Sequence, residues 1–375
     1  MATPNRLLRR GRLLAVLFAL VFACAAPAAH ATPGTDATDW LVSQLQPTPT
    51  SDPATCPSFS AAGIVGQSID CMFAFHAAGA SYDGERNATY AYVKANMTDF
   101  VGSASCSSTK APLSAAAVAK LSLAVLVRGV DQPTSIGGRN LIADLQCLQD
   151  ANGRFVDKNQ TDFSNVFGQS FAIIALKACQ TYCTSPPAGL ATTLSNAAKY
   201  LRGQQCSGGT MSLNGAFRSP LGLTANQCNA NPPFDPPNPD NLNAVDVDST
   251  GIAVEALLTE GTFASLMSGG AAATWLGAQV QTSGPPARAW WRNYCDFGSP
   301  TSIKPSVNST ALAVMAYVEA GLTITSAQAW LADAVASGTN RGLPACGATG
   351  NGDVLATGQG ILGLYGVSYP QLAGV

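Results

Sequence analysis

The 375-residue chain has few aromatic residues (7%), few charged residues (11%) and two histidines, His30 and His76. After residue 31, no apolar run approaches the ~20 residues that a membrane-spanning helix needs. The sequence also contains no CxxC pair, no phosphate-binding glycine loop and no nucleophile triad. We therefore predict a protein with no stable membrane insertion, no metal site and no cofactor.

The first 31 residues have the pattern of a secretory signal peptide. Four arginines precede an apolar run, Leu13 to Ala26, which is followed by the small-residue site Ala29-His30-Ala31. Cleavage after Ala31 would leave residues 32–375 as one domain of a secreted, extracellular protein. That domain has 16 basic and 22 acidic residues, a net charge of −6, which disfavours nucleic acid as a partner.

Pairs of predicted helices repeat along the chain. The first helix of each pair carries two bulky residues, and the second carries a small residue at a constant place. The bulky pairs begin at Trp40, Tyr92, Leu141, Tyr200, Trp275 and Trp330, and the small residues are Ala74, Ala124, Ala175, Ala256, Ala316 and Gly363. The spacing is 32 to 34 residues in four repeats and longer in the fourth and fifth, so we predict a large proline-rich insertion at about 206–245.

Six helix pairs favour an all-α fold, an (α/α)6 toroid of six inner and six outer helices. The small residues would let neighbouring inner helices approach closely and close the ring, although an open solenoid would use the same repeat. We expect a monomer.

Ten cysteines remain after removal of the signal peptide, and an even number in an exported chain predicts disulfides. Cys56 and Cys106 lie in equivalent loops of adjacent repeats, as do Cys295 and Cys346. Cys206 and Cys228 bracket part of the insertion. We predict these three pairings and leave those of Cys71, Cys147, Cys179 and Cys183 open.

Two segments resemble motifs of the terpenoid cyclase and protein prenyltransferase superfamily of α/α toroids. One is "QDANGRF" with Gln149, Gly153 and Phe155, and the other is "KYLRGQQCSGGTM" with Gln205, Gly209 and Met211. The resemblance covers nearly the whole mature chain and implies the same toroid. The superfamily also includes carriers of cobalamin, which implies that such a ring can hold a small molecule.

The resemblance implies a role for the stretch "DVDST", Asp246 to Thr250, because the acid motif of the cyclases reads D-x-D-D-T. Asp248 falls where those enzymes have their proton donor. This makes a terpene-cyclase-like isomerase one alternative function. The prenyltransferases use a zinc site with a histidine, and no histidine follows His76.

The other repeats place helix-capping residues where this stretch has Asp246. The equivalent residues are Ser114, Asn165, Ser306, Asp353 and Ile64. With Asp246 included, five of the six residues in this column are typical N-caps. The column of Asp248 has no other acid, and the column of Glu255 is otherwise apolar. Seven residues separate them, so both lie on one face of a helix, about 10 Å apart along its axis.

Two interpretations of this pair stay open. In one, Asp248 adds to the cap and Glu255 reaches a basic neighbour such as Lys120. In the other, both line a central pocket, as in a carbohydrate-active enzyme that uses two carboxyl groups. Asp248 and Glu255 are therefore the candidate catalytic residues of this sequence.

The inner helices begin with polar residues, which would meet at one mouth of a closed ring. Two tryptophans of "AWWRNYCDF" precede the fifth inner helix. The candidate ligand-binding residues are Gln67, Asp70, Gln169, Asp248, Thr250, Glu255, Trp290, Trp291, Asn308 and Thr310. We therefore expect a secreted toroid that binds a small molecule or acts as a scaffold without catalysis, the two enzymes above being alternatives.

Overall fold

The computed structural model describes residues 32–48, 51–57, 61–103, 105–108, 112–207, 214–222, 245–261, 270–283, 286–293, 304–337, 341–345 and 351–375. The predicted signal peptide lies outside them, so its cleavage stays a prediction. Most of the insertion at 206–245 also lies outside them. Among the described helices, none combines the length and the apolar character needed to cross a bilayer.

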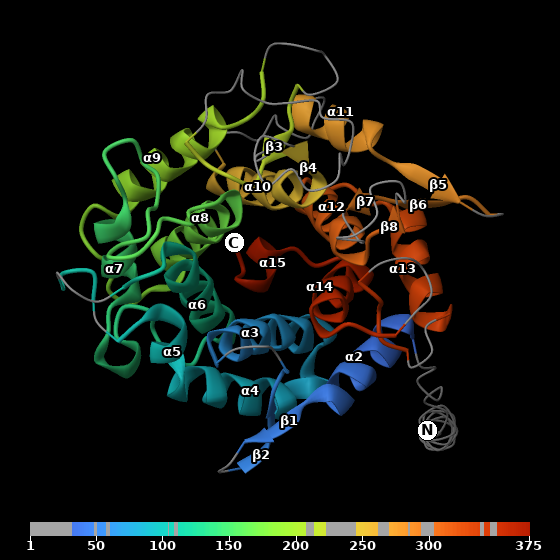
Figure 1. The fold of residues 1–375 in the computed structure, drawn as a ribbon, viewed down its shortest axis with the longest axis horizontal. Helices are drawn as coiled ribbons and strands as arrows, with labels where there is room; N and C mark the ends of the chain where they lie inside the picture. Colours follow the sequence, from blue (N-terminus) through green and yellow to red (C-terminus); the bar gives the residue numbers. More distant parts are fainter. Residues whose placement is uncertain are drawn as a thin grey trace, which may run out of the picture. The chain divides into compact units, whose positions relative to one another are not determined.

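The unit Pro33–Val375 contains two concentric layers of helices (Figure 1). The inner helices are α3 (Ala61–Ala78), α6 (Ala115–Arg128), α8 (Val166–Tyr182), α10 (Val247–Glu260), α12 (Val307–Glu319) and α14 (Val354–Tyr365). The outer helices are α2 (Pro33–Gln44), α4 (Asp83–Ala95), α7 (Leu141–Leu148), α9 (Leu190–Gly203), α11 (Ala271–Ala278) and α13 (Thr325–Ser337). Every small residue predicted for an inner helix and every bulky pair predicted for an outer helix lies in the expected element.

The inner helices form a closed ring, because each contacts the next and α14 returns to α3. Glycines allow this approach. A Cβ on Gly168 of α8 would lie 2.7 Å from Ala116 Cβ of α6, and one on Gly251 of α10 would lie 2.9 Å from the Leu312 carbonyl of α12. Since real Cβ atoms do not come this close, larger residues would force the inner helices apart. The predicted (α/α)6 toroid is confirmed.

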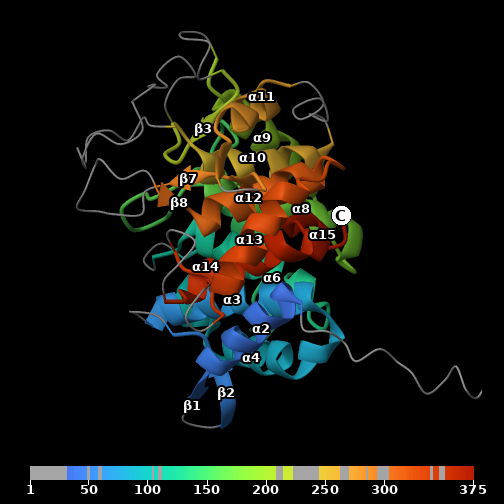
Figure 2. The same cartoon turned by 90° about the vertical axis from the view of Figure 1, so that its right-hand side faces the viewer.

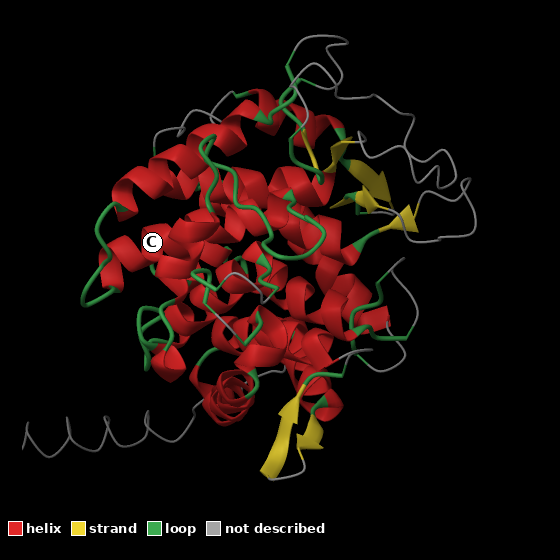
Figure 3. Cartoon of the chain, turned by 60° about the vertical axis from the view of Figure 1, so that its left-hand side comes forward, coloured by secondary structure: helices red, strands yellow, loops and turns green. Residues whose placement is uncertain are grey.

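The remaining elements are short. They are α5 (Met97–Val101), the 3-10 turns Ala80–Tyr82 and Ile136–Gly138, and α15 (Tyr369–Leu372). Within the described ranges, the antiparallel strand pairs are β1 (Gln46–Thr48) with β2 (Ser51–Thr55), β3 (Phe217–Arg218) with β4 (Val245–Asp246), β5 (Gln281–Ser283) with β6 (Arg288–Trp290), and β7 (Arg292–Asn293) with β8 (Lys304–Pro305). Figure 3 shows how small the strand content is. Figure 2 shows β3, β7 and β8 at one end of the ring and α15 at the other.

Five inner helices begin with the predicted caps. The side chains of Ser114, Asn165, Asp246, Ser306 and Asp353 each accept a hydrogen bond from the backbone N–H three residues on. The sixth helix, α3, starts at Ala61, three residues before the capping column at Ile64. The capping interpretation of Asp246 is therefore confirmed.

A second column, four residues after the cap, ties each incoming loop to its inner helix. Thr250 Oγ1 accepts from Phe217 N–H at 2.9 Å and donates to the Asp246 carbonyl at 2.7 Å. The same loop N–H contact recurs in four further repeats. The acceptors there are Ser68, Gln169, Thr310 and Thr357, and the donors are Cys56, Phe155, Trp291 and Leu343 respectively. These residues satisfy buried loop backbone that would otherwise lack a partner.

The hydrogen bonds of these loops also correct the residue spacing predicted for the second glutamine–glycine motif. Gln149 Nε2 donates to the Gly153 carbonyl, and Gln205 Nε2 donates in the same way to the Gly215 carbonyl. The partners of Gln205 are therefore Gly215 and Phe217, six residues later than the sequence spacing predicts. Gly209 and Met211 lie outside the described residues. A six-residue insertion hid this equivalence.

Three disulfides join described cysteines: Cys56–Cys71, Cys106–Cys147 and Cys179–Cys183. The predicted Cys56–Cys106 pairing is wrong. Each loop cysteine is held by a helix of its own neighbourhood, because Ser68 of α3 binds Cys56 N–H and Asp144 of α7 binds Cys106 N–H. Cys206 is also disulfide-bonded. Cys228, Cys295 and Cys346 lie outside the described residues, so those pairings stay predictions.

The loop tie predicts a specific loss of stability on Thr250→Val. The valine keeps the shape but leaves the buried Phe217 N–H without an acceptor, which costs about 1–3 kcal/mol. Thr250→Ser keeps the hydroxyl and should lose less. Urea unfolding of both variants measures the difference, and equal stability of the valine and serine variants would contradict this role.

Candidate functional site

The C-terminal element α15 identifies which face of each inner helix points to the ring centre. It lies inside the ring (Figure 1) and contacts α3, α8, α10 and α12. The Tyr369 ring packs edge-on against Phe73 of α3 and Phe171 of α8, with centroids 5.5 and 5.1 Å apart. The residues that contact α15, and those at helical spacing from them, therefore form the inward face.

Three rows of residues make up this face, from the N-terminal ends of the helices downwards. The first inward row is Gly66, Ala116, Phe167, Asp248, Asn308 and Leu355. The second inward row, four residues later, is Asp70, Lys120, Phe171, Ile252, Leu312 and Gln359. The third inward row, three residues further, is Phe73, Leu123, Ile174, Glu255, Met315 and Leu362.

Burial increases along these rows. In the first inward row every residue except Gly66 keeps partial exposure, in the second only Lys120 and Gln359 do, and in the third all six are buried. The inward face is therefore partly exposed near the N-terminal ends of the inner helices and buried from the third row onwards.

Glu255 does not line an accessible pocket, so that part of the carboxylate-pair hypothesis is wrong. It is fully buried, and its Oε2 accepts from Tyr369 N–H at 3.0 Å. Beside it, Glu319 Oε2 accepts from the Ser368 hydroxyl at 2.5 Å. Burial raises the pKa of Glu255 well above its usual value, and the nearby Glu319 adds to this rise. Burial also raises the pKa of Glu319, to about 7.

Lys120, the basic partner expected for Glu255, pairs with Asp70 instead. Lys120 Nζ forms an ion pair of 2.7 Å with Asp70, between adjacent helices α6 and α3, and donates to the Gly66 carbonyl. Burial raises the pKa of Asp70, an effect that Lys120 opposes. Asp70 is thus at the bottom of the accessible face, as a member of a charged pair.

Asp246 and Asp248 have different surroundings. Asp246 is bound within its cap by Ser249 N–H at 2.6 Å and the Ser249 hydroxyl at 2.8 Å, and burial raises its pKa to about 6. Asp248 is half-buried on the first inward row. Asp248, which has no acidic counterpart in the other repeats, is therefore the aspartate that lies at the mouth.

Several predicted ligand-binding residues are instead committed to the fold. Gln169, Thr250 and Thr310 hold the incoming loops, and Gln169 Nε2 also donates to the Gly153 and Ala197 carbonyls. Trp291 is fully buried, with Nε1 bonded to the Leu276 carbonyl. Sequence reasoning grouped these residues by position near the mouth, but position along a helix does not tell which side of it they occupy.

The remaining predicted residues keep partial exposure. Asn308 lies on the first inward row beside Asp248, on the neighbouring helix α12, and is half-buried. Gln67 is half-buried next to Gly66 on α3. Trp290 is half-buried and packs against the main apolar core. The hypothesis of a polar mouth thus rests on Asp248, Asn308 and Gln67, whereas Trp290 belongs to β6, which contacts the outer helix α13.

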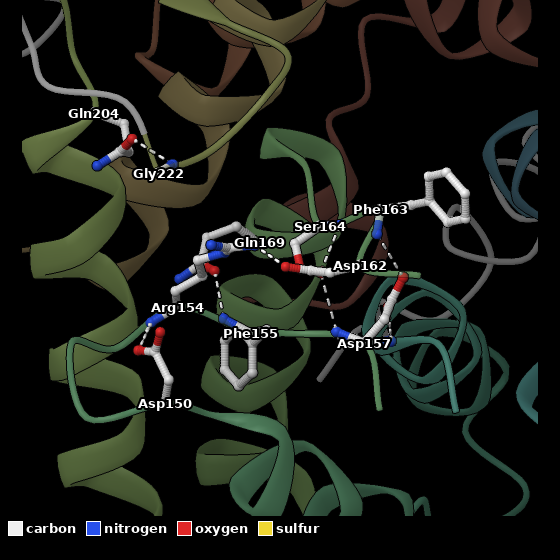
Figure 4. Close-up of polar contacts among 11 residues, drawn as sticks. Asp150, Arg154, Phe155, Asp157, Asp162, Phe163, Ser164, Gln169, Gln204 and Gly222 are labelled. Atoms are coloured by element: carbon white, nitrogen blue, oxygen red, sulfur yellow. Dashed lines mark hydrogen bonds and ion pairs between the residues drawn. The ribbon is translucent and has the colours of Figure 1, made fainter. Parts of the chain in front are cut away.

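Sequence reasoning missed an aromatic group on the α8 side of the mouth. Phe167 and Phe171 lie one turn apart on the inward face of α8. Above them, Phe163 is 71% exposed, on the loop that precedes α8. Figure 4 shows its ring pointing away from the polar contacts of this loop. The sequence signal for this aromatic group was the spacing of four residues between Phe163, Phe167 and Phe171.

That loop is held firmly at the mouth. Asp157 accepts hydrogen bonds from Phe163 N–H and from Ala115 N–H at the start of α6, at 3.1 and 2.8 Å. Asp162 pairs with Arg154 and accepts from Asp157 N–H and Ser164 N–H (Figure 4). These contacts fix Phe163 between the N-terminal ends of α6 and α8.

A separate cavity of about 470 Å³ lies away from the ring centre. Its lining includes Ser103, Ser105, the Arg139–Asp144 ion pair and the Cys106–Cys147 disulfide. Within the described part of the chain, no group of three or more histidine, cysteine, aspartate or glutamate residues is arranged to hold a metal ion.

Comparisons with known proteins concern the fold. No family profile and no curated protein matches this chain. Among solved structures, an inactive variant of the α-1,6-mannanase GH76A of Salegentibacter sp. HEL1_6, bound to α-1,6-mannotetrose, is similar with a TM-score of 0.55 and 10% identity, over 91% of this chain and 98% of that one. The glycoside hydrolase family 76 mannosidase Bt3792 from Bacteroides thetaiotaomicron has a TM-score of 0.55 and 9% identity, over 91% and 97%.

These likenesses show an α/α toroid. The toroid fold implied by the terpenoid cyclase resemblance is thus confirmed. The identification with the terpenoid cyclase and prenyltransferase superfamily is not supported, because the similar solved structures described above are glycoside hydrolases.

The raised pKa of Glu319 predicts a dependence of stability on pH. The folded protein binds this proton more tightly than the unfolded chain, so its contribution is present below about pH 4.5 and is lost as pH rises through about 7. Glu319→Gln should remove on the order of 2 kcal/mol of the fall in unfolding free energy between pH 5 and pH 8. Denaturant unfolding at both values measures it, with Glu85→Gln on outer helix α4 as a charge-matched control. An unchanged pH dependence in Glu319→Gln would contradict the assignment.

Proposed function

We propose that this chain binds a neutral oligosaccharide at the mouth formed by the N-terminal ends of the inner helices. The observation that carries the proposal is the composition of the accessible inward face. Phe163 and Phe167 lie on the α8 side, whereas Asp248 and Asn308 lie on the neighbouring helices α10 and α12. Aromatic rings pack on the C–H faces of sugars, and carboxylate and amide groups hydrogen-bond their hydroxyls.

Charge supports a neutral ligand. The one lysine of the second inward row, Lys120, is paired with Asp70, and Asp248 places a carboxylate in the first row. An anionic ligand would therefore meet the Asp248 carboxylate in the first inward row and a lysine that is already paired in the second. A neutral ligand rich in hydroxyl donors meets acceptors instead.

The similar solved structures agree with this class of ligand, since the mannanase variants are bound to α-1,6-linked mannotetrose and mannotriose. An exported chain, as its first 31 residues predict, would meet such glycans outside the cell. This deepens the sequence-based expectation of a small-molecule binder by naming the ligand class.

A terpene-cyclase-like reaction has less support from the inward face. A carbocation intermediate needs aromatic surroundings without nucleophiles. Here the second inward row places the Asp70–Lys120 pair and Gln359 beside Phe171. Their oxygen atoms would capture a cation formed near Asp248.

The proposal predicts binding that depends on Phe163. Because this side chain is exposed, Phe163→Ala should fold normally and weaken binding of α-1,6-linked mannotetraose by roughly tenfold, the loss of one stacking contact. Isothermal titration calorimetry measures it, with gluco- and xylo-oligosaccharides of the same length as a panel for specificity.

Two controls accompany this measurement. Phe163→Trp keeps a stacking surface and should retain affinity, and Leu322→Ala removes an exposed apolar side chain just past the C-terminal end of α12 and should change nothing. If no oligosaccharide of the panel binds, or if Phe163→Ala binds like the wild type, the proposal fails.

Glycoside cleavage is the second candidate, and the position of the half-buried Asp248 on the first inward row favours it. The mannanase variant is inactive with two consecutive aspartates replaced by alanine. The present sequence has no two consecutive aspartates. The other acid of the first two inward rows is Asp70, which is buried on α3, across the ring from α10.

Mass spectrometry of mannotetraose incubated with the protein tests cleavage. Shortened products that disappear in Asp248→Asn would support it. Products that persist in that variant would remove Asp248 from the reaction.

A further inference from the structure

The accessible inward face has a closed bottom. All six residues of the third inward row are buried. Tyr369 occupies that centre, packed against Phe171 of the second row and Phe73 of the third. A molecule that enters at the mouth therefore meets Phe171 and the Asp70–Lys120 pair, and Tyr369 fills the space beneath them.

This closure is held by hydrogen bonds as well as by packing. Two buried acids of neighbouring inner helices, Glu255 and Glu319, accept from Tyr369 N–H and the Ser368 hydroxyl. Ser368 and Gln371 also form a reciprocal capping box at the start of α15. The first residues of α15, which fills the bottom of the ring, are thus hydrogen-bonded to α10 and α12.

The structure assigns to this site the end of a glycan chain and not an internal segment. This inference rests on the proposed function and adds the part of the substrate that is recognised. An internal segment directed along the ring axis would need an exit on both sides, and the side of α15 is filled. A terminal sugar can instead descend past Phe167 and reach the second inward row, where Gln359 and Lys120 keep partial exposure.

The alternative is a chain that lies across the mouth. It would contact Phe163 and the first inward row without reaching the second. The two arrangements differ in how they tolerate a bulky group on a chain end, because only a descending end is enclosed.

Mannotetraose blocked by a bulky aromatic group at its reducing end, and the same sugar blocked at its non-reducing end, separate the two arrangements in calorimetric titrations of the wild-type protein. We expect one blocked form to bind at least about 100-fold more weakly than the free sugar, and the other within about twofold. Similar affinity for both blocked forms and the free sugar would overturn end recognition while leaving oligosaccharide binding intact. Absence of binding by the free sugar would refute the proposed function, and this inference with it.

A second-row variant provides an independent readout. Gln359→Leu keeps a similar volume and removes the amide, and we expect it to weaken the binding of free mannotetraose by about tenfold. Gln328→Leu on outer helix α13 is the matched control and should bind like the wild type. Unchanged affinity in a folded Gln359→Leu variant, verified by its thermal unfolding, would place the ligand across the mouth and overturn the inference.

Discussion

The ring depends on one repeated contact, in which a side chain in the first turn of an inner helix accepts a hydrogen bond from the loop that leads into it. Thr250 with Phe217 N–H is one example, and Gln169 with Phe155 N–H is another. Each contact satisfies a buried backbone donor and fixes the start of an inner helix relative to the outer layer. With the loops fixed, the opposite faces of the helices remain available to form a mouth.

The inward face divides into a functional and a structural half. Near the N-terminal ends, Asp248, Asn308 and Phe167 keep access to solvent. Towards the C-terminal ends, Glu255 accepts a hydrogen bond from Tyr369 N–H and so holds α15 inside the ring. Two acids that look alike in the sequence, seven residues apart on one helix, therefore serve different purposes because α15 covers one and leaves the other.

Repetition made most of the fold predictable from the sequence. Comparing equivalent columns identified Asp246 as a cap, since four other helices place a cap at the same point. The comparison failed where the determining contact is remote: the partner of Glu255 is Tyr369, 114 residues further on. It also took Thr310 for a ligand-binding residue, because a hydroxyl that holds a loop and one that holds a ligand look the same in a sequence. Phe163 was missed since it precedes its helix.

The central claim is that a sugar binds on the inward face at the mouth, and a crystal structure of the protein soaked with α-1,6-linked mannotetraose tests it most directly. The account predicts a sugar ring against Phe167, with hydroxyls bonded to Asp248 and Asn308. Sugar bound only elsewhere, such as in the cavity lined by Ser103 and Asp144, or no bound sugar at saturating concentration, would contradict it.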